Sequence, residues 1–220
     1  AMADACGRPP LTVTAHYLAP GRPGPAEVTV DVHRAGRRMA TASAAVRDAD
    51  GEVIRVLGTF AELREEGPRH VDAAPPELPP PDECLRLTPP APGSGFGDRV
   101  VMLTHPDDAG FREGRPSGRA ELRGGFEFAD RAPIDVHGLM VAVDSFAPVV
   151  FNLPDAVMSW APTIELTVHV RGVPVPGPVR CRFFSRFVQG GMFEEEAEVW
   201  DAAGTLVAQS RQLALMPRNG

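Results

Sequence analysis

The chain repeats itself, because residues 11–61, moved forward by 153 positions, align with residues 164–214 without a gap. Twelve residues are identical along this alignment, which is more than chance provides in one unbroken register. In the first copy they are Thr14, His16, Pro23, Gly24, Pro25, Met39, Ala44, Val46, Asp48, Ala49, Gly51 and Ala61. A repeat of this length that occurs only twice is too long for a solenoid unit. The sequence therefore predicts a duplicated domain whose copies pair about a pseudo-twofold axis.

Each copy begins with a run in which apolar and polar side chains alternate. Residues 11–18 and 164–171 show this period of two, which is typical of a strand with one buried face. A Pro-Gly-Pro turn follows, since proline lacks the N–H and glycine relaxes φ. Three further strands are predicted in each copy, over 26–34, 38–48 and 53–60 and over 179–187, 191–201 and 206–215. We expect the four successive strands to form an antiparallel meander in each copy.

The segment between the copies has a different composition. Nine prolines lie between Pro68 and Pro92, with few large apolar residues. Such a segment cannot bury enough surface to offset its ordering entropy, so we expect an extended connection. The predicted organisation is a first repeat over 1–63, a proline-rich linker over 64–97 and a second repeat over 98–220.

The second repeat opens with a strand, over residues 118–128, and a helix. From Asp135, apolar residues recur at the spacing of one helical face, with Pro133 placed to start the helix and Pro148 to end it. These apolar residues are Val136, Leu139, Met140 and Val143. A strand, a helix and then four strands is the order of a hot-dog domain, in which an antiparallel sheet wraps a central helix.

The first copy shows only the tail of such a helix, in residues 1–6 followed by Gly7 at the C′ position. The alignment places the start of this helix, and the strand before it, upstream of residue 1. We therefore expect an α+β double hot-dog. Its two antiparallel sheets would each wrap a central helix and join edge to edge, with the first helix largely missing from the chain.

Composition restricts the class of protein. The net charge of -7, without a block of basic residues, argues against nucleic acid as a partner. No run approaches about 18 apolar residues, so no membrane span is predicted. Cys6, Cys84 and Cys181 are odd in number and lack metal spacing, which favours free thiols in a reducing cytoplasm.

Two acidic clusters are interpreted as structural. His105, Asp107 and Asp108 lack a partner cluster, so we expect a solvated turn and no metal site. The run 194–196 of three glutamates lies in a predicted strand and is interpreted as an exposed face. The chain has no Gly-x-Ser-x-Gly motif, which excludes the serine-hydrolase mechanism built on that motif.

The two copies differ in polar groups. Thr163 aligns with Pro10, and Gln212 aligns with Thr59. Asp144 lies at the end of the apolar helical stripe, where a carboxylate is costly unless it is hydrogen-bonded. Duplication followed by divergence commonly leaves one working site and one scaffold copy. The asymmetry therefore predicts a site in the second copy.

Three segments of the second copy, at 143–145, 162–165 and 207–218, resemble those of the double hot-dog acyl-CoA thioesterases of the thioesterase II type. The resemblance covers essentially the whole chain. It implies that Asp144, Thr163 and Gln212 hold and activate one water that attacks a thioester carbonyl. Asp144 would be the general base or water orienter, and a backbone N–H near the central helix would form the oxyanion site.

Other interpretations remain open at this point. Asp144 alone could satisfy a helix end, and Thr163 and Gln212 could be ordinary strand residues. The favoured function is a thioester hydrolase without a cofactor, acting on acyl-CoA or an acyl-carrier thioester. The alternative is a non-catalytic acyl-thioester-binding or interaction module, and a homodimer is left open. A hot-dog dehydratase is a weaker third, because Asp135 and His137 are too close on one helical turn.

Overall fold

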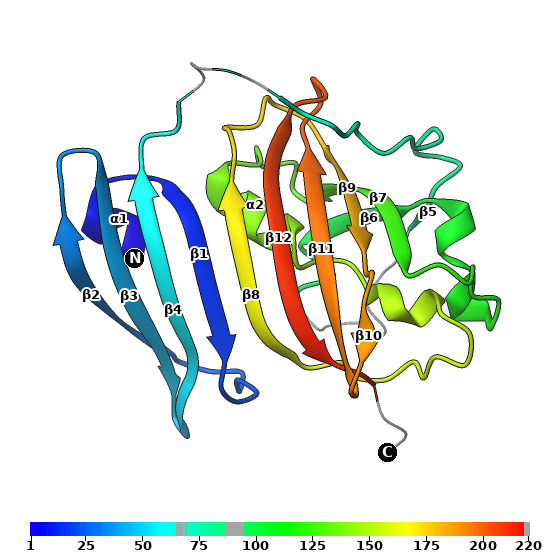
Figure 1. The fold of residues 1–220 in the computed structure, drawn as a ribbon, viewed down its shortest axis with the longest axis horizontal. Coiled ribbons are helices and arrows are strands. Elements are labelled where there is room, and N and C mark those ends of the chain that lie inside the picture. The colour runs from blue at the N-terminus through cyan, green and yellow to red at the C-terminus, as the bar shows by residue number, and fades with distance from the viewer. Residues whose placement is uncertain (65–67, 69, 87–94, 218–220) are drawn as a thin grey trace.

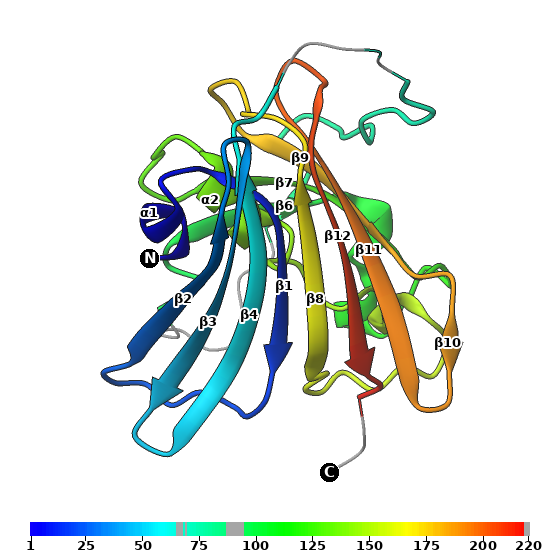
Figure 2. The same ribbon diagram turned by 60° about the vertical axis from the view of Figure 1, so that its left-hand side comes forward.

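The computed structural model describes residues 1–64, 68, 70–86 and 95–217, and its strands form one antiparallel sheet (Figure 1). The strand order is β2-β3-β4-β1-β8-β12-β11-β9-β7-β6-β5, and the short β10 pairs with β11. Helices α1 and α2 lie on the same side of this sheet (Figures 1 and 2). None of the described helices is long and apolar enough to cross a membrane.

The elements of the first half are α1 (Met2–Cys6), β1 (Pro10–Tyr17), β2 (Glu27–Ala35), β3 (Met39–Asp48) and β4 (Gly51–Ala61). Those that follow are β5 (Leu85–Arg86), β6 (Val100–Thr104), η1 (Pro106–Asp108), η2 (Gly110–Glu113), β7 (Glu121–Phe128), α2 (Val136–Ala142), η3 (Val149–Asn152), β8 (Thr163–Val170), β9 (Val179–Phe184), β10 (Val188–Gln189), β11 (Met192–Trp200) and β12 (Leu206–Leu215). The elements labelled η are short 3₁₀ helices. The division of the chain at 64–97 stays a prediction.

The two halves join where β1 pairs with β8. In this antiparallel pair Thr14 lies opposite Thr167, and their hydroxyl oxygens are 2.9 Å apart in a hydrogen bond. These two threonines are equivalent in the sequence repeat. A residue that faces its own equivalent lies on the axis relating the copies, so the pseudo-twofold axis passes through this pair. The predicted continuous layer, with the halves edge to edge, is confirmed.

The predicted four-strand meander is wrong for the first strand of each copy. β1 pairs with β4 instead of β2, and β8 pairs with β12 instead of β9. The Pro-Gly-Pro segment therefore connects strands that lie three positions apart, a span of about 14 Å at the usual strand spacing. This order leaves the second edge of β1 free, and β8 occupies it.

Helix α2 begins just after Asp135 instead of at Pro133, and it ends earlier than predicted. The side chain of Asp135 accepts hydrogen bonds from the backbone N–H groups of His137 (2.9 Å) and Gly138 (2.8 Å), which caps the first turn. The helix ends at Ala142, not near Pro148, because the Val141 carbonyl accepts from the backbone N–H of Asp144 at 3.2 Å, a 3₁₀-type bond that closes the last turn; it also accepts from the Ser145 hydroxyl.

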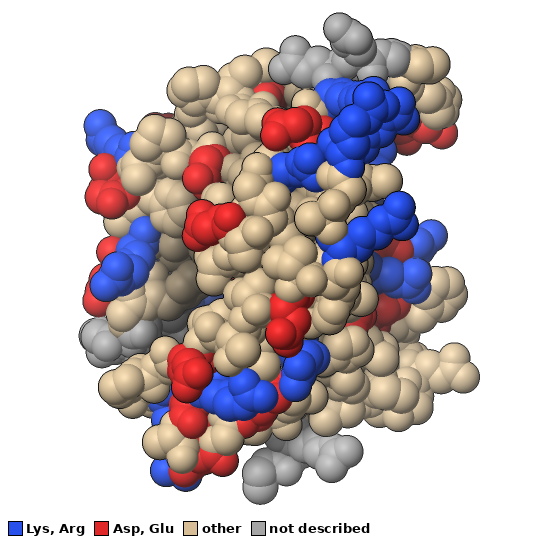
Figure 3. All heavy atoms as spheres, turned by 90° about the vertical axis from the view of Figure 1, so that its left-hand side faces the viewer, with Lys and Arg blue, Asp and Glu red and all other residues tan. Residues whose placement is uncertain are grey.

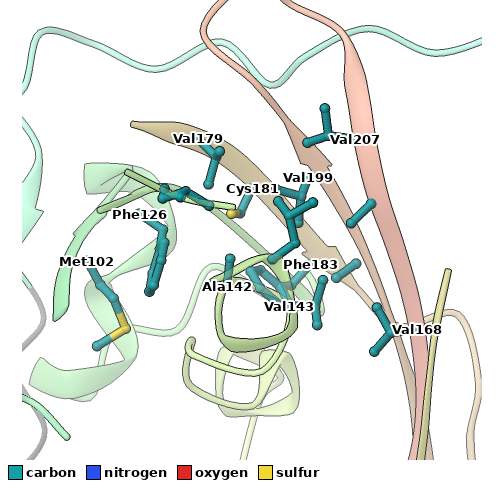
Figure 4. Close-up of a cluster of buried hydrophobic side chains, with 14 of the residues drawn as sticks. Met102, Phe126, Ala142, Val143, Val168, Val179, Cys181, Phe183, Val199 and Val207 are labelled. Atoms are coloured by element: carbon teal, nitrogen blue, oxygen red, sulfur yellow. The ribbon is translucent and has the colours of Figure 1, made fainter. Parts of the chain in front are cut away.

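The core lies between α2 and the sheet of the second half. Figure 4 shows Ala142 and Val143 beside Phe183 and Val199, and all four are at most 2% exposed. In the first half the short α1 contacts β2, β3 and β4, buries none of its own residues, and ends at Gly7, whose φ is 64°. The double hot-dog prediction is confirmed, with a small central helix in the second half.

The outer edge of the first half is less covered. Val28 and Val32 on β2 are 47% and 43% exposed. Charged residues of both signs are scattered over this side of the molecule (Figure 3). Mixed charges near an edge strand oppose pairing with another chain.

Gly124→Ala is expected to destabilise the fold. A Cβ at Gly124 would lie 2.5 Å from the Leu103 carbonyl oxygen and closer still to the Phe146 ring. We expect a loss of about 2 kcal/mol or more in the free energy of unfolding, measured by urea denaturation. Gly125→Ala is the control, because its Cβ would meet nothing nearer than 4.0 Å. Equal losses from both substitutions would contradict this packing.

Candidate active site

A chain of hydrogen bonds crosses three neighbouring strands, β8, β12 and β11. Thr163 begins β8, Gln212 lies on β12, and Glu195 lies opposite Gln212 on β11. The Thr163 hydroxyl donates to Gln212 Oε1 at 2.9 Å, and Gln212 Nε2 donates to Glu195 Oε1 at 2.7 Å. Two of the three predicted site residues are thus in direct contact.

Glu195 is a buried carboxylate, only 4% exposed. Its second oxygen, Oε2, accepts from the backbone N–H of Val149 at 2.8 Å, which ties β11 to η3. Burial raises the pKa of Glu195 to about 7; the negative charges of Asp144 and Glu194 add to the rise, while the two hydrogen bonds oppose it.

The interpretation of residues 194–196 as an exposed face is wrong. Glu194 is also buried, and its Oε1 accepts from the backbone N–H groups of Arg186 and Phe187 at 2.7 and 3.2 Å. Glu195 shares its face of β11 with the buried Phe193 and Ala197, as the period of two requires.

Two signals in the sequence could have found Glu195. It lies two residues from Phe193 and from Ala197, in the same register as these apolar residues, which indicates an inward side chain. It also aligns with Ala42 of the first copy, so it shows the same asymmetry between the copies as Thr163 and Gln212. Both signals were missed because residues 194–196 are all glutamates, and a run of charged residues is typical of an exposed surface.

Asp144 lies just after the end of α2 and faces the first half. Its Oδ2 accepts from the Tyr17 hydroxyl of β1 at 3.4 Å, and its side chain keeps exposure to solvent. The atoms packed around the carboxylate desolvate it and raise its pKa to about 6, against the lowering effect of the Tyr17 hydrogen bond. Burial and the Asp144 charge raise the pKa of Tyr17 to about 12, so Tyr17 remains a donor at neutral pH.

The site therefore has two parts, and the structure joins them through charge. Thr163 and Gln212 are linked to Glu195 by hydrogen bonds, whereas Asp144 accepts a hydrogen bond from Tyr17. The charge of Asp144 acts on Glu195 through space. An exposed carboxylate with a pKa of about 6 is suited to accept a proton from water. The catalytic roles of Asp144, Thr163 and Gln212 stay a prediction.

The cluster at His105, Asp107 and Asp108 is not a solvated turn throughout. Asp108 is fully buried, and its Oδ2 accepts from Nε and the backbone N–H of Arg123 at 2.8 and 3.0 Å. The Asp108 carboxylate therefore has a structural role as the partner of Arg123. No group of three or more His, Cys, Asp or Glu side chains in the described part of the chain could hold a metal ion.

Comparisons with known proteins cover both halves. The model of the acyl-CoA thioesterase N-terminal domain matches residues 1–61, and that of the C-terminal domain matches residues 75–216. A crystal structure from Thermobifida fusca, of a protein assigned as a thioesterase II, is 34% identical with a TM-score of 0.83. The match covers 95% of this chain and 79% of that one.

Two further relatives are more distant. An uncharacterised protein of Mycobacterium tuberculosis is 25% identical in an alignment of 234 positions that covers 96% of this chain and 77% of that protein. A protein of Alicyclobacillus acidocaldarius with a hot-dog fold is 22% identical, with a TM-score of 0.82 over 97% of this chain and 80% of that one. This last likeness concerns the fold alone.

Glu195→Gln is expected to change how stability depends on pH. The folded protein holds a proton on Glu195 up to about pH 7, whereas the unfolded chain releases it near pH 4.5. The stability from this proton is present below about pH 4.5 and is lost as pH rises through 7. The variant lacks this loss, so its urea midpoint relative to the parent should rise between about pH 5 and pH 8. A difference that does not vary with pH would contradict the buried titration.

Proposed function

Because the chain belongs to the acyl-CoA thioesterase family, we propose that it hydrolyses acyl-CoA or acyl-carrier thioesters at one site per chain, formed by Asp144, Thr163 and Gln212. The observation that carries the proposal is the hydrogen-bond chain from Thr163 through Gln212 to Glu195, close enough to Asp144 for their charges to interact. This chain of hydrogen bonds starts on β8, the strand that pairs with the first half, and Tyr17 of the first half donates to Asp144.

The mechanism follows from what each group can donate or accept. The Thr163 hydrogen is directed to Gln212, so the lone pairs of Thr163 Oγ1 can accept from a water. Gln212 Nε2 has one hydrogen on Glu195 and a second with which to hold that water. Asp144 takes the water proton as the oxygen attacks the thioester carbonyl. A backbone N–H near α2 would stabilise the oxyanion; its collapse expels the thiolate, which takes the proton back from Asp144.

The first half supports the limit of one site per chain. The positions that align with Thr163, Gln212 and Glu195 are Pro10, Thr59 and Ala42. Pro10 and Ala42 have no polar side chain, so the same hydrogen-bond chain cannot form there. The first half contributes the sheet edge and Tyr17.

Asp144→Asn is expected to remove most of the activity. Thiol release from a panel of acyl-CoA substrates should fall by about 10² or more, because the general base is lost. In the parent, activity should rise as Asp144 loses its proton near pH 6, and the variant should lack this rise. Asp31→Asn, at an exposed aspartate of β2, is the control and should leave both unchanged. Unchanged turnover in Asp144→Asn would favour the non-catalytic binding module.

Gln212→Ala tests the asymmetry between the halves. If Gln212 positions the water, hydrolysis should fall by roughly 10² or more, as is typical of a lost catalytic hydrogen bond. Thr59→Ala, at the aligned position of the first half, should leave kcat nearly intact. Both variants are compared by steady-state thiol release. Equal losses of kcat in Gln212→Ala and Thr59→Ala would contradict the model of one site per chain.

A further inference from the structure

Glu195 has no role in the mechanism above, yet it is the most buried carboxylate of the site. Its two oxygens are occupied by Gln212 Nε2 and the Val149 N–H. With 4% exposure it has no surface left for water or a thioester. Any effect of Glu195 on the reaction must therefore pass through Gln212.

The carboxylate controls the direction of the hydrogen-bond chain. An ionised carboxylate only accepts, whereas a side-chain amide has one donor end and one acceptor end. Ionised Glu195 therefore requires Nε2 of Gln212 to face it, and Oε1 is left to face Thr163. The Thr163 hydroxyl must then donate to Gln212, and its lone pairs stay available to a water.

We propose that ionised Glu195 is a positioning residue, which sets the direction of the Thr163–Gln212 hydrogen bond so that Thr163 accepts from the attacking water. The inference rests on the proposed function, since it concerns the same water.

A neutral side chain at position 195 reverses the donor and acceptor roles along the hydrogen bonds from Glu195 through Gln212 to Thr163. The Val149 N–H needs an acceptor oxygen, so the donor end of a protonated Glu195, or of a glutamine, must face Gln212. The Gln212 amide then turns, and its Nε2 donates to Thr163. Thr163 Oγ1 then keeps one lone pair, and its hydroxyl hydrogen, released from Gln212, is free to donate to the water oxygen and occupy the lone pair needed for attack. Turning the Gln212 amide changes no side-chain volume, so the packing around Gln212 and position 195 stays the same.

The charges around Glu195 favour this reversal at low pH. Among the described residues, Asp144 after α2 and Glu194 on β11 act on it, and both are negative. Tyr17 of β1 faces Asp144 and stays neutral. β12 and η3 present the neutral amide of Gln212 and the Val149 N–H.

The test is Glu195→Gln, with Glu198→Gln on the opposite face of the same strand as the matched control. At about pH 8, kcat of Glu195→Gln should fall by about 10-fold or more with KM little changed, whereas the control should match the parent. The ratio of parent to variant kcat should shrink toward one as pH falls below about 7, where the parent also carries a neutral Glu195. A purely structural role would lower kcat by one factor at every pH.

A double-mutant cycle shows whether the effect passes through Gln212. In a Gln212→Ala background, Glu195→Gln should change kcat less than about twofold. Equal kcat for Glu195→Gln and parent at about pH 8, a ratio that is constant with pH, or an undiminished effect without Gln212 would each overturn the proposal while hydrolysis itself stands.

The side-chain amide NMR signals of Gln212 give a readout without turnover. In the parent they should shift between about pH 5 and pH 8.5 as Glu195 ionises, and at high pH Glu195→Gln should keep the low-pH signals. This titration remains decisive if the variant does not fold, since unchanged parent signals over that range would overturn the proposal. A parent that releases no thiol from any acyl-CoA or acyl-carrier thioester, but shows the titration, would instead contradict the proposed function.

Discussion

The pairing of β1 with β8 is the interaction on which the rest of the structure depends. Each half would otherwise expose an unpaired strand edge, which invites association with another chain. Pairing the two edges buries both and places equivalent threonines, Thr14 and Thr167, against each other. The same contact brings Tyr17 of the first half onto Asp144 of the second. The surroundings of Asp144 in the candidate site therefore come from both halves of one sheet.

Divergence of the copies explains why a symmetric scaffold has an asymmetric site. At the inward position of the third long strand, the first half has the small Ala42 and the second has Glu195. An unpaired carboxylate there would be very costly, but Val149 and Gln212 both donate to it. The polar side chains of Thr163, Gln212 and Glu195 thus have hydrogen-bond partners within the second half, and the first half keeps an apolar interior.

Many of the strand and helix bounds could be predicted from hydrophobic periodicity and from residues that end helices or form turns. The bounds of β12 agree with the predicted 206–215, and Gly7 ends α1 where expected. Strand order did not follow, because alternation says which face of a strand is buried and nothing about its neighbours. Helix α2 ended early because the Val141 carbonyl accepts from the Asp144 N–H in a tighter turn, a local hydrogen bond that hydrophobic spacing does not reveal.

By itself the sequence determined that two copies of one strand pattern pair about an axis, and that Thr163 and Gln212 belong to the copy with polar substitutions. These properties follow from residue identities between the two copies and from the alternation of apolar and polar residues along each strand. Only the tertiary structure decided which carboxylate meets Gln212, since Glu195 and Asp144 lie on different elements. The pKa of each follows from the same cause. Burial and through-space charge depend on what packs around a group, and that is set by segments far apart in the chain.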